Sequence, residues 1–383
     1  MEDVLLRSQA LVESFAALVR SELPEDIEIF DAHVHLGTDI DGMKGDLDGL
    51  LRIQKRAGIS RSFVFCLDEP DRHPGFRAPN DRTLGYAARS DGALIPFVRL
   101  DLGESPIEEA TRCLDLGARG IKLHPRAQRF LLDDERLAPV FELAAARRVP
   151  ILIHGGRGLP PIADALAWLM DAYEAQLIVA HAGIADLAAL ARHFSGRPGV
   201  FFDTSVWSAL DLLDLYRLVA PEQVLYASDY PYGQQPASLL LALRTARMAG
   251  LDDAQLRAML GGSATRIANA QDAVPLSAPR GPADISTPIT FARIHQYLSM
   301  ATPLLWTRQA DTIGVLGLAL NACDERSNGH REATDQIREL LLVARDLWRV
   351  LPEAVDADVA RTARTAFRLL HLANVLAVTS ADT

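Results

Sequence analysis

The run IEIFDAHVHLG (27–37) is rich in β-branched and aromatic residues and ends in two histidines separated by a single residue. It is the first of eight such runs, and each is followed by a longer segment with apolar residues at three- and four-residue intervals. The runs lie mostly about 25 to 35 residues apart, which is the size of a βα unit. The others are SRSFVFCLD (60–68), ALIPFVRLD (93–101), ARGIKLHP (118–125), VPILIHGG (149–156), AQLIVAHAG (175–183), VFFDTSVW (200–207) and VLYASDYPYG (224–233).

Eight βα units predict an α/β fold, a (β/α)8 barrel over residues 27–272. The rival is an open doubly wound sheet, which usually carries a glycine-rich nucleotide-binding turn after its first strand. That turn reads LGTDIDGMKGD (36–46), without the GxGxxG spacing, so the barrel is favoured. Outside it, residues 1–26 predict an N-terminal helix, and residues 273–383 predict a linker followed by a C-terminal helical region. The apolar stripes of that region predict burial against the barrel or a second subunit.

Net charge and cysteine content limit the partners and the cellular compartment expected for this protein. The net charge of −11 over 383 residues argues against a nucleic-acid or anionic-membrane partner. Cys66, Cys113 and Cys323 lack any paired or zinc-binding spacing, which favours a reducing compartment. The first 26 residues do not resemble a signal peptide, and the apolar tract 369–378 is too short to span a bilayer. We therefore expect a cytoplasmic protein.

Polar residues stand at the ends of six of the eight predicted strands. The carboxyl ends of barrel strands meet on one face, and side chains two apart on a strand point the same way, so these residues are predicted to converge. Any one of them could be an ordinary core or surface residue. Burying them together is costly unless a partner such as a divalent metal satisfies them. They are His33, His35, Lys122, His124, His154, His181, Asp203 and Asp229.

These motifs resemble the amidohydrolase superfamily, in the branch that includes aminocarboxymuconate-semialdehyde decarboxylase. DAHVHLG, GIKLHPRAQ, PILIHGG, LIVAHAG, VFFDTS, VLYASDYPYG and LRAMLGGSATRIA occur in the family's order over about residues 27–270. The resemblance implies that His33, His35, His154 and Asp229 hold a divalent metal, with His181 as the acid/base or polarising residue beside it. Zinc is the expected metal, and Mn²⁺ or Fe²⁺ would accept the same ligands.

Lys122 leaves the number of metal ions open. In two-metal members of the superfamily, a fourth-strand lysine is carboxylated and bridges the ions, and the fifth- and sixth-strand histidines hold the second ion. By that resemblance His181 would join the metal ligands. The alternative is that the Lys122 ammonium binds a substrate carboxylate or an acidic neighbour.

The resemblance implies a hydrolase in which Asp229 and His181 assist attack of water on an amide, lactone or other ester of a small molecule. The alternative is non-oxidative decarboxylation of an aromatic or unsaturated carboxylic acid, with Arg126 and Arg157 as candidate substrate-binding cations beside Arg72. Hydrolysis is preferred because Lys122 matches the two-metal pattern. A third hypothesis is an inactive barrel acting as a binding or scaffold protein. Related barrels are often dimers, so a homodimer is expected.

Overall fold

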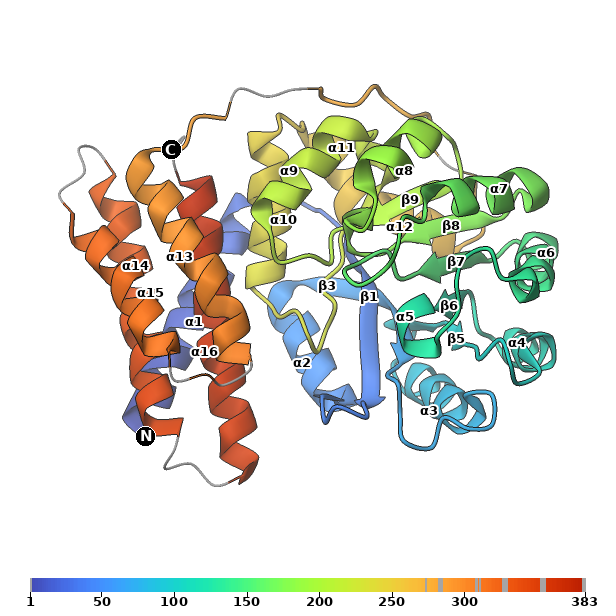
Figure 1. The fold of residues 1–383 in the computed structure, drawn as a ribbon, viewed down its shortest axis with the longest axis horizontal. Coiled ribbons are helices and arrows are strands. Elements are labelled where there is room, and N and C mark those ends of the chain that lie inside the picture. Colours follow the sequence, from blue (N-terminus) through green and yellow to red (C-terminus); the bar gives the residue numbers. More distant parts are fainter. Residues whose placement is uncertain are drawn as a thin grey trace. The chain divides into compact units, whose positions relative to one another are not determined.

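A computed structural model describes residues 2–272, 274–281, 285–306, 309, 311–325, 330–351 and 356–380 (Figure 1). The chain forms two compact units. The barrel unit comprises Pro24–Gln234 and Ala249–Ala283, and the helical unit comprises Met1–Leu23, Gln235–Met248 and Asp284–Thr383. Residues 274–281 of the predicted linker form neither helix nor strand, whereas its residues 273 and 282–284 lie outside the described residues.

The barrel unit has eight parallel strand positions, within a segment that is described throughout. Two short strands, β4 (Leu94–Pro96) and β5 (Val98–Arg99), make the third position, because Phe97 between them donates its N–H to Val64 O. A short strand, β2 (Lys44–Gly45), pairs antiparallel with the end of the first position. The other seven are β1 (Ile29–Thr38), β3 (Ile59–Cys66), β6 (Ile121–Leu123), β7 (Pro150–Ile153), β8 (Gln176–Val179), β9 (Val200–Asp203) and β10 (Val224–Leu225).

Backbone hydrogen bonds join the last position to the first. Ala32 N donates to Tyr226 O at 2.8 Å, and His35 N donates to Tyr230 O at 2.7 Å. Asp229 N donates in return to His33 O at 3.0 Å. With parallel pairing between the other neighbours, these bonds close the sheet on itself. The predicted (β/α)8 barrel is confirmed.

Helices follow the strands around the outside of the barrel (Figure 1). The first shows how the sequence sets their limits: the Asp46 side chain accepts from Gly49 N at its start, and Gly58 ends it in the left-handed region. The barrel-unit helices are α2 (Leu47–Ala57), α3 (Arg77–Ala88), α4 (Pro106–Asp115), α5 (Pro125–Gln128), α6 (Ala138–Arg147), α7 (Ala163–Tyr173), α8 (Leu187–Phe194), α9 (Ala209–Leu218), α11 (Asp253–Arg257) and α12 (Ser263–Ala268).

An irregularity in β1 sets the directions of its side chains. Phe30 and Ala32 lie in the barrel's apolar interior, and strict alternation would then turn His33 and His35 outward. The pairing of β1 with β3 shifts between Asp31 and Val34, so both histidines contact Phe65 of that interior. The bulge therefore lets one strand contribute both to the core and to the polar end of the barrel.

The helical unit gathers three separate parts of the chain. Its helices are α1 (Glu2–Glu22), α10 (Ala237–Met248), α13 (Ile289–Trp306), α14 (Thr312–Asp324), α15 (Arg331–Val350) and α16 (Asp356–Thr379). Within the unit, α15 packs on α16, α13 on α14, and both α1 and α10 contact α16. The apolar stripes noted in the sequence, such as Leu340, Leu347 and Leu369, are buried in the single chain, so their burial does not require a second subunit.

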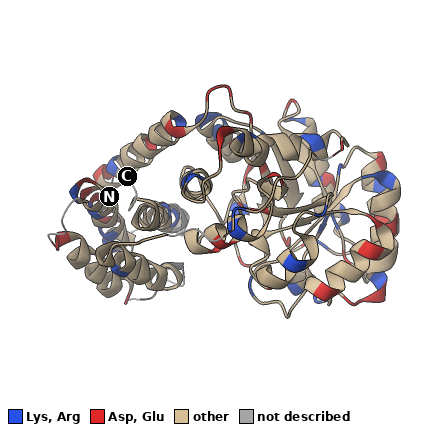
Figure 2. Cartoon of the chain, turned by 90° about the horizontal axis from the view of Figure 1, so that it is seen from above, with Lys and Arg blue, Asp and Glu red and all other residues tan. Residues whose placement is uncertain are grey.

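Charged residues of both signs are interspersed along the helices of each unit (Figure 2). No helix among the described residues is long and apolar enough to cross a membrane.

Candidate metal centre

Three polar atoms converge at the carboxyl end of the barrel. The Nε2 atoms of His33 and His35 are 3.1 Å apart, and Asp229 Oδ1 lies 3.4 Å from the first and 3.5 Å from the second. Both histidines are buried, and the Asp229 side chain is 14 % exposed. Ligands about 2.0–2.2 Å from a tetrahedral metal lie about 3.4 Å from one another. These three residues can therefore hold a metal ion.

The other nitrogen of each imidazole is engaged elsewhere. His33 Nδ1 lies 2.8 Å from Asp203 Oδ2, and His35 Nδ1 lies 3.3 Å from the Cys66 carbonyl oxygen. A carboxylate and a carbonyl only accept hydrogen bonds, so each Nδ1 carries the proton and each Nε2 keeps its lone pair. Burial lowers the pKa of His33 and of His35 well below the usual range, so both rings are neutral, as metal ligands must be.

Asp31 and a strained backbone bring Asp229 to this pair. Asp31 Oδ1 accepts from Ser228 N at 2.9 Å and from His33 N at 3.3 Å, which ties β1 to the segment after β10. Asp229 has a φ of 59°, in the left-handed region that few residues other than glycine adopt. Burial raises the pKa of Asp229 to about 6, whereas positive charge on His181 or Lys122 lowers it.

His154 and His181 stand beside the three converging residues. Their rings are 4.6 Å apart, and His181 is 5.1 Å from the ring of His33. Their ligand atoms are outside the group formed by His33, His35 and Asp229. His154 Nε2 is buried and has no hydrogen-bond partner in the described part of the chain, as expected of an atom that awaits a ligand.

His181 Nδ1 lies 2.8 Å from the Ser205 carbonyl oxygen and must donate to it, so the neutral ring presents an unprotonated Nε2. Neutral His181 can accept a proton or bind a metal, and it can donate to an oxyanion only when protonated. His124 has the opposite arrangement. Its Nδ1 accepts from Ala127 N at 3.3 Å, which leaves the proton on Nε2, and its ring stacks on His154 at 3.9 Å.

Two buried basic residues, Lys122 and Arg99, lie on the adjacent strands β6 and β5. Lys122 on β6 is 0 % exposed, and its Nζ lies 4.8 Å from the Phe65 ring centre, without a hydrogen-bond partner in the described residues. Burial lowers the pKa of the Lys122 ammonium to about 7, although the charge of Asp203 opposes this. Arg99 on β5 is 2 % exposed and pairs in register with Lys122.

The three loop arginines considered as substrate-binding residues lie elsewhere. Arg126 is exposed, and its stem lies against Gly158. Arg157 is exposed too and lies near Asp211 on α9. Burial raises the pKa of Asp211, and the positive charge of Arg157 partly opposes this effect. The Nε atom of Arg72 is 3.1 Å from Asp68 Oδ1. Among the described residues, the side chains of these arginines make no hydrogen bond or ion pair with His33, His35 or Asp229, whereas the Arg157 backbone hydrogen-bonds His154.

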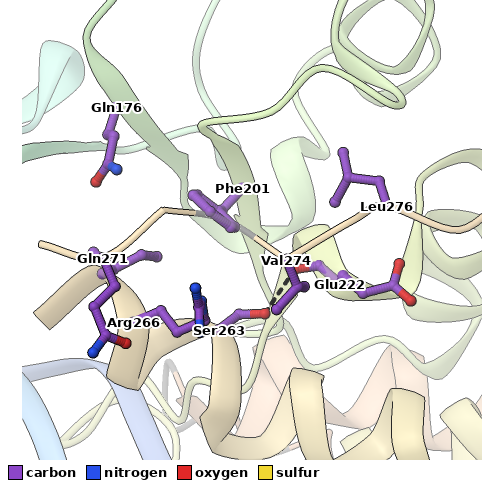
Figure 3. A pocket seen from close by; sticks show the side chains of 9 residues that line it. Gln176, Phe201, Glu222, Ser263, Arg266, Gln271, Val274 and Leu276 are labelled. Carbon is purple, nitrogen blue, oxygen red and sulfur yellow. Dashed lines mark hydrogen bonds between the residues drawn. The ribbon is translucent and has the colours of Figure 1, made fainter. Parts of the chain in front are cut away.

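A small hollow lies at the opposite end of the barrel. Gln176, the first residue of β8, and Phe201 on β9 form one wall, and the chain after α12 crosses it at Val274 and Leu276 (Figure 3). Its two strand residues, Gln176 and Phe201, lie in the amino-terminal halves of β8 and β9. It is therefore separate from the candidate metal centre, which lies where the strands end.

Sequence reasoning missed the roles of Asp31, Asp203 and Arg99. Asp31 belongs to the DAHVHLG motif, and Asp203 stands at a strand end, so both could be noticed but not paired with His33 without the fold. Arg99 carried one signal: it is a charged residue inside the otherwise apolar run ALIPFVRL (93–100).

Comparison with known proteins gives a family and a fold. The sequence profile of the amidohydrolases matches residues 31–267. A protein described as a probable 2-pyrone-4,6-dicarboxylic acid hydrolase from Acinetobacter baumannii, solved with citric acid bound, superposes with a TM-score of 0.51 at 11% identity, over 63% of this chain and 100% of its own. The 5-carboxyvanillate decarboxylase of Sphingomonas paucimobilis gives 0.50 at 14% identity, over 64% and 99%. No curated protein matches the sequence significantly.

Proposed function

Since this chain belongs to the amidohydrolase family, we propose that it is a metal-dependent hydrolase acting on an amide, lactone or other ester of a small molecule. His33, His35 and Asp229 would hold the metal, completed by His154, with His181 beside it. The observation that carries the proposal is the convergence of two lone-pair nitrogens and one carboxylate oxygen within 3.5 Å. Structural neighbours support the fold of this proposal and leave the reaction open.

The donor set fits a divalent metal. Imidazole and carboxylate suit Zn²⁺, and Mn²⁺ and Fe²⁺ accept the same ligands, so zinc is our proposed metal. Hydrogen bonds on the side away from the metal also orient the histidine ligands. Asp203 fixes the tautomer of His33, and the Cys66 carbonyl fixes that of His35. The unpartnered Nε2 of His154 supplies one further lone pair.

Residues of the chain would then carry out the proton transfers of the reaction. A bound divalent metal supplies hydroxide at neutral pH by lowering the pKa of water from 15.7 to about 7. Asp229, whose carboxylate is partly exposed, would take a proton from the attacking water and return it to the leaving group. His181 would relay that proton through its unprotonated Nε2, held in this tautomer by the Ser205 carbonyl.

Lys122 has two possible roles that metal stoichiometry separates. Carboxylated by CO₂, it would bridge two ions, the second held by His154 and His181. As an ammonium, it would bind a negative group of the substrate. Protein grown with ample zinc and bicarbonate should contain two ions per chain in the first case and one in the second, measured by elemental analysis.

Decarboxylation on the same centre is the second candidate. The observation that favours it is the pair of buried cations, Arg99 and Lys122, next to the candidate metal centre. The neighbour from Sphingomonas is a decarboxylase, and the neighbour from Acinetobacter is described as a hydrolase. Turnover of lactones and esters supports hydrolysis, whereas release of CO₂ from an aromatic or unsaturated carboxylic acid supports the alternative.

Metal loading tests the proposed function itself. The wild-type protein should take up at least one zinc ion per chain, and His33→Ala should take up less, with unchanged circular dichroism. A wild-type protein that cannot be loaded would overturn the proposal and favour a binding or scaffold role. We also propose a cytoplasmic location, consistent with three buried free cysteines, and a homodimer, which light scattering can test.

A further inference from the structure

Arg99 presents a free pair of hydrogen-bond donors inside the barrel. Its Nη1 donates to the Cys66 carbonyl oxygen at 3.4 Å. Its Nε and Nη2 are both buried and make no hydrogen bond to any residue that the structure describes. These two N–H groups form one side of the guanidinium, where they point in parallel and match the two oxygens of a carboxylate.

The backbone of Arg99 is fixed, so the direction of this pair is set by the fold. The Asn80 side chain accepts from Arg99 N at 2.9 Å and donates to Arg99 O at 2.9 Å. The guanidinium carbon lies 4.9 Å from the ring centre of Phe76. Because Arg99 is 2 % exposed, leaving two donors unpaired there costs free energy that a bound anion would recover.

A second buried amine or ammonium group, that of Lys122, lies on the next strand. Arg99 and Lys122 are register partners in the parallel pair β5 and β6, so their side chains leave the sheet on the same side. Lys122 Nζ is likewise buried and lacks a hydrogen-bond partner among the described residues. Two positive charges repel each other here, and an anion beside Arg99 would favour the protonated, charged form of Lys122.

These cations lie beside the candidate metal centre. Arg99 Nη1 and His35 Nδ1 donate to the same acceptor, the Cys66 carbonyl oxygen, at 3.4 and 3.3 Å. The Lys122 ammonium approaches Phe65, the residue whose ring also contacts His33 and His35. A group bound by Arg99 and Lys122 would therefore belong to a molecule that reaches the metal.

Asp68 is the nearest alternative partner of Arg99. Its Oδ1 is 3.9 Å from Nη2, too far for a hydrogen bond, and the same oxygen is 3.1 Å from Arg72 Nε. Asp68 thus forms an ion pair with each of the two arginines, but it makes no hydrogen bond to Nε or Nη2 of Arg99.

We propose that Arg99, with Lys122 beside it, forms a subsite for a carboxylate of the substrate, separate from the group that reacts at the metal. This proposal adds a substrate class to the proposed function. It depends on that function in one respect: the bound carboxylate belongs to the substrate of the same site. The substrate class is then a carboxylic acid that also carries a hydrolysable or decarboxylatable group. Arg99 is the specificity-determining residue, because its two parallel donors select a planar carboxylate.

Calorimetric titration with succinate, in a buffer free of carboxylates and phosphate, tests the subsite. We expect Arg99→Gln to weaken succinate binding tenfold or more, while the affinity for acetohydroxamate, a metal ligand without a carboxylate, stays within about twofold. Arg197→Gln is the control, since that arginine pairs with Asp171 on α7 and makes no contact with Arg99, Asn80 or Lys122 among the described residues. It should bind both probes as the wild type does.

Three results would overturn the subsite. They are wild-type protein that does not bind succinate, equal losses of succinate and acetohydroxamate affinity in Arg99→Gln, and tighter Arg99-dependent binding of inorganic phosphate than of succinate. If Arg99→Gln does not fold, the wild-type structure with succinate decides. A carboxylate within about 3.2 Å of Nε and Nη2 supports the proposal, and succinate bound elsewhere contradicts it.

The titration is also run on metal-free protein, which separates this proposal from the proposed function. Arg99 and Lys122 do not depend on a metal for their positions, so succinate should bind the metal-free wild type and not metal-free Arg99→Gln. A protein that takes up no metal would refute the proposed function and leave this comparison valid. Metal uptake without Arg99-dependent succinate binding would refute the subsite alone.

Discussion

Asp203→Asn should weaken metal binding by changing the tautomer of one proposed ligand. Asp203 Oδ1 accepts from three donors: His181 N at 2.8 Å, Ser205 N at 3.0 Å, and the Ser205 hydroxyl. Its Oδ2 accepts from His33 Nδ1 alone. An asparagine would keep its single oxygen toward the three donors and turn its NH₂ toward His33.

That NH₂ group can only donate, so His33 Nδ1 would have to accept. The neutral ring would then carry its proton on Nε2, the atom that faces His35 and Asp229. Binding a metal would require moving this proton back and placing two donors against each other. Loss of a residue that orients a metal-bound histidine typically costs 10- to 100-fold in affinity, or about 1.4 to 2.8 kcal/mol.

Competition with a chromophoric zinc chelator would measure this change. Ser205→Ala is the control. It removes a hydroxyl that donates to Asp203 and lies 2.9 Å from His181 Nδ1, and it keeps both the Asp203–His33 bond and the Ser205 carbonyl that accepts from His181. We expect its zinc affinity to stay within about threefold of the wild type. In the metal-free Asp203→Asn variant, imidazole ¹⁵N shifts should place the His33 proton on Nε2. Wild-type zinc affinity in Asp203→Asn, or an equal loss in Ser205→Ala, would refute the tautomer argument.

Three further changes test the surroundings of the site. Gly156→Ala would place its Cβ 2.9 Å from both His154 Cε1 and His181 Cδ2, so the rings must move; we expect zinc affinity to fall about tenfold with circular dichroism retained. Asn80→Ala leaves the buried N–H and C=O of Arg99 unpaired and should lower the free energy of unfolding by about 2 to 4 kcal/mol in urea titration. Zinc at a hundred times its Kd should stabilise the protein by about 2.7 kcal/mol, so a chelator should lower Tm and added zinc restore it.

The barrel was predictable because its signals are local and repeated. Each apolar run is followed by helical periodicity, and eight repeats leave few alternatives. The meeting of His33, His35 and Asp229 followed from the same reasoning, since parallel strands bring their carboxyl ends to one face. Strand alternation correctly gave the two histidines a common direction.

What the sequence could not supply were relations between separate strands. Nothing in DAHVHLG announces the shift in pairing that turns both Ala32 and His33 toward the interior, because a bulge depends on the partner strand. Asp203 lies 170 residues from His33, so their hydrogen bond is visible only in the fold. The loop arginines were considered for their position after strands, whereas Arg99, inside a strand, has the unpaired donors.

At the carboxyl end of the barrel, hydrogen-bond acceptors lie on one side and hydrogen-bond donors on the other. On one side, Asp203 and Asp229 on and after strands β9 and β10 supply acceptors, which orient a histidine and complete the proposed metal ligands. On the other, Arg99 and Lys122 on β5 and β6 supply only donors, and Arg99 Nε, Arg99 Nη2 and Lys122 Nζ make no hydrogen bond to any described residue. A metal satisfies the first side and adds positive charge, which makes the second side less stable without an anion. If the proposed subsite exists, a negatively charged substrate would therefore offset the combined positive charge of the metal, Arg99 and Lys122, and metal binding and substrate class would be linked.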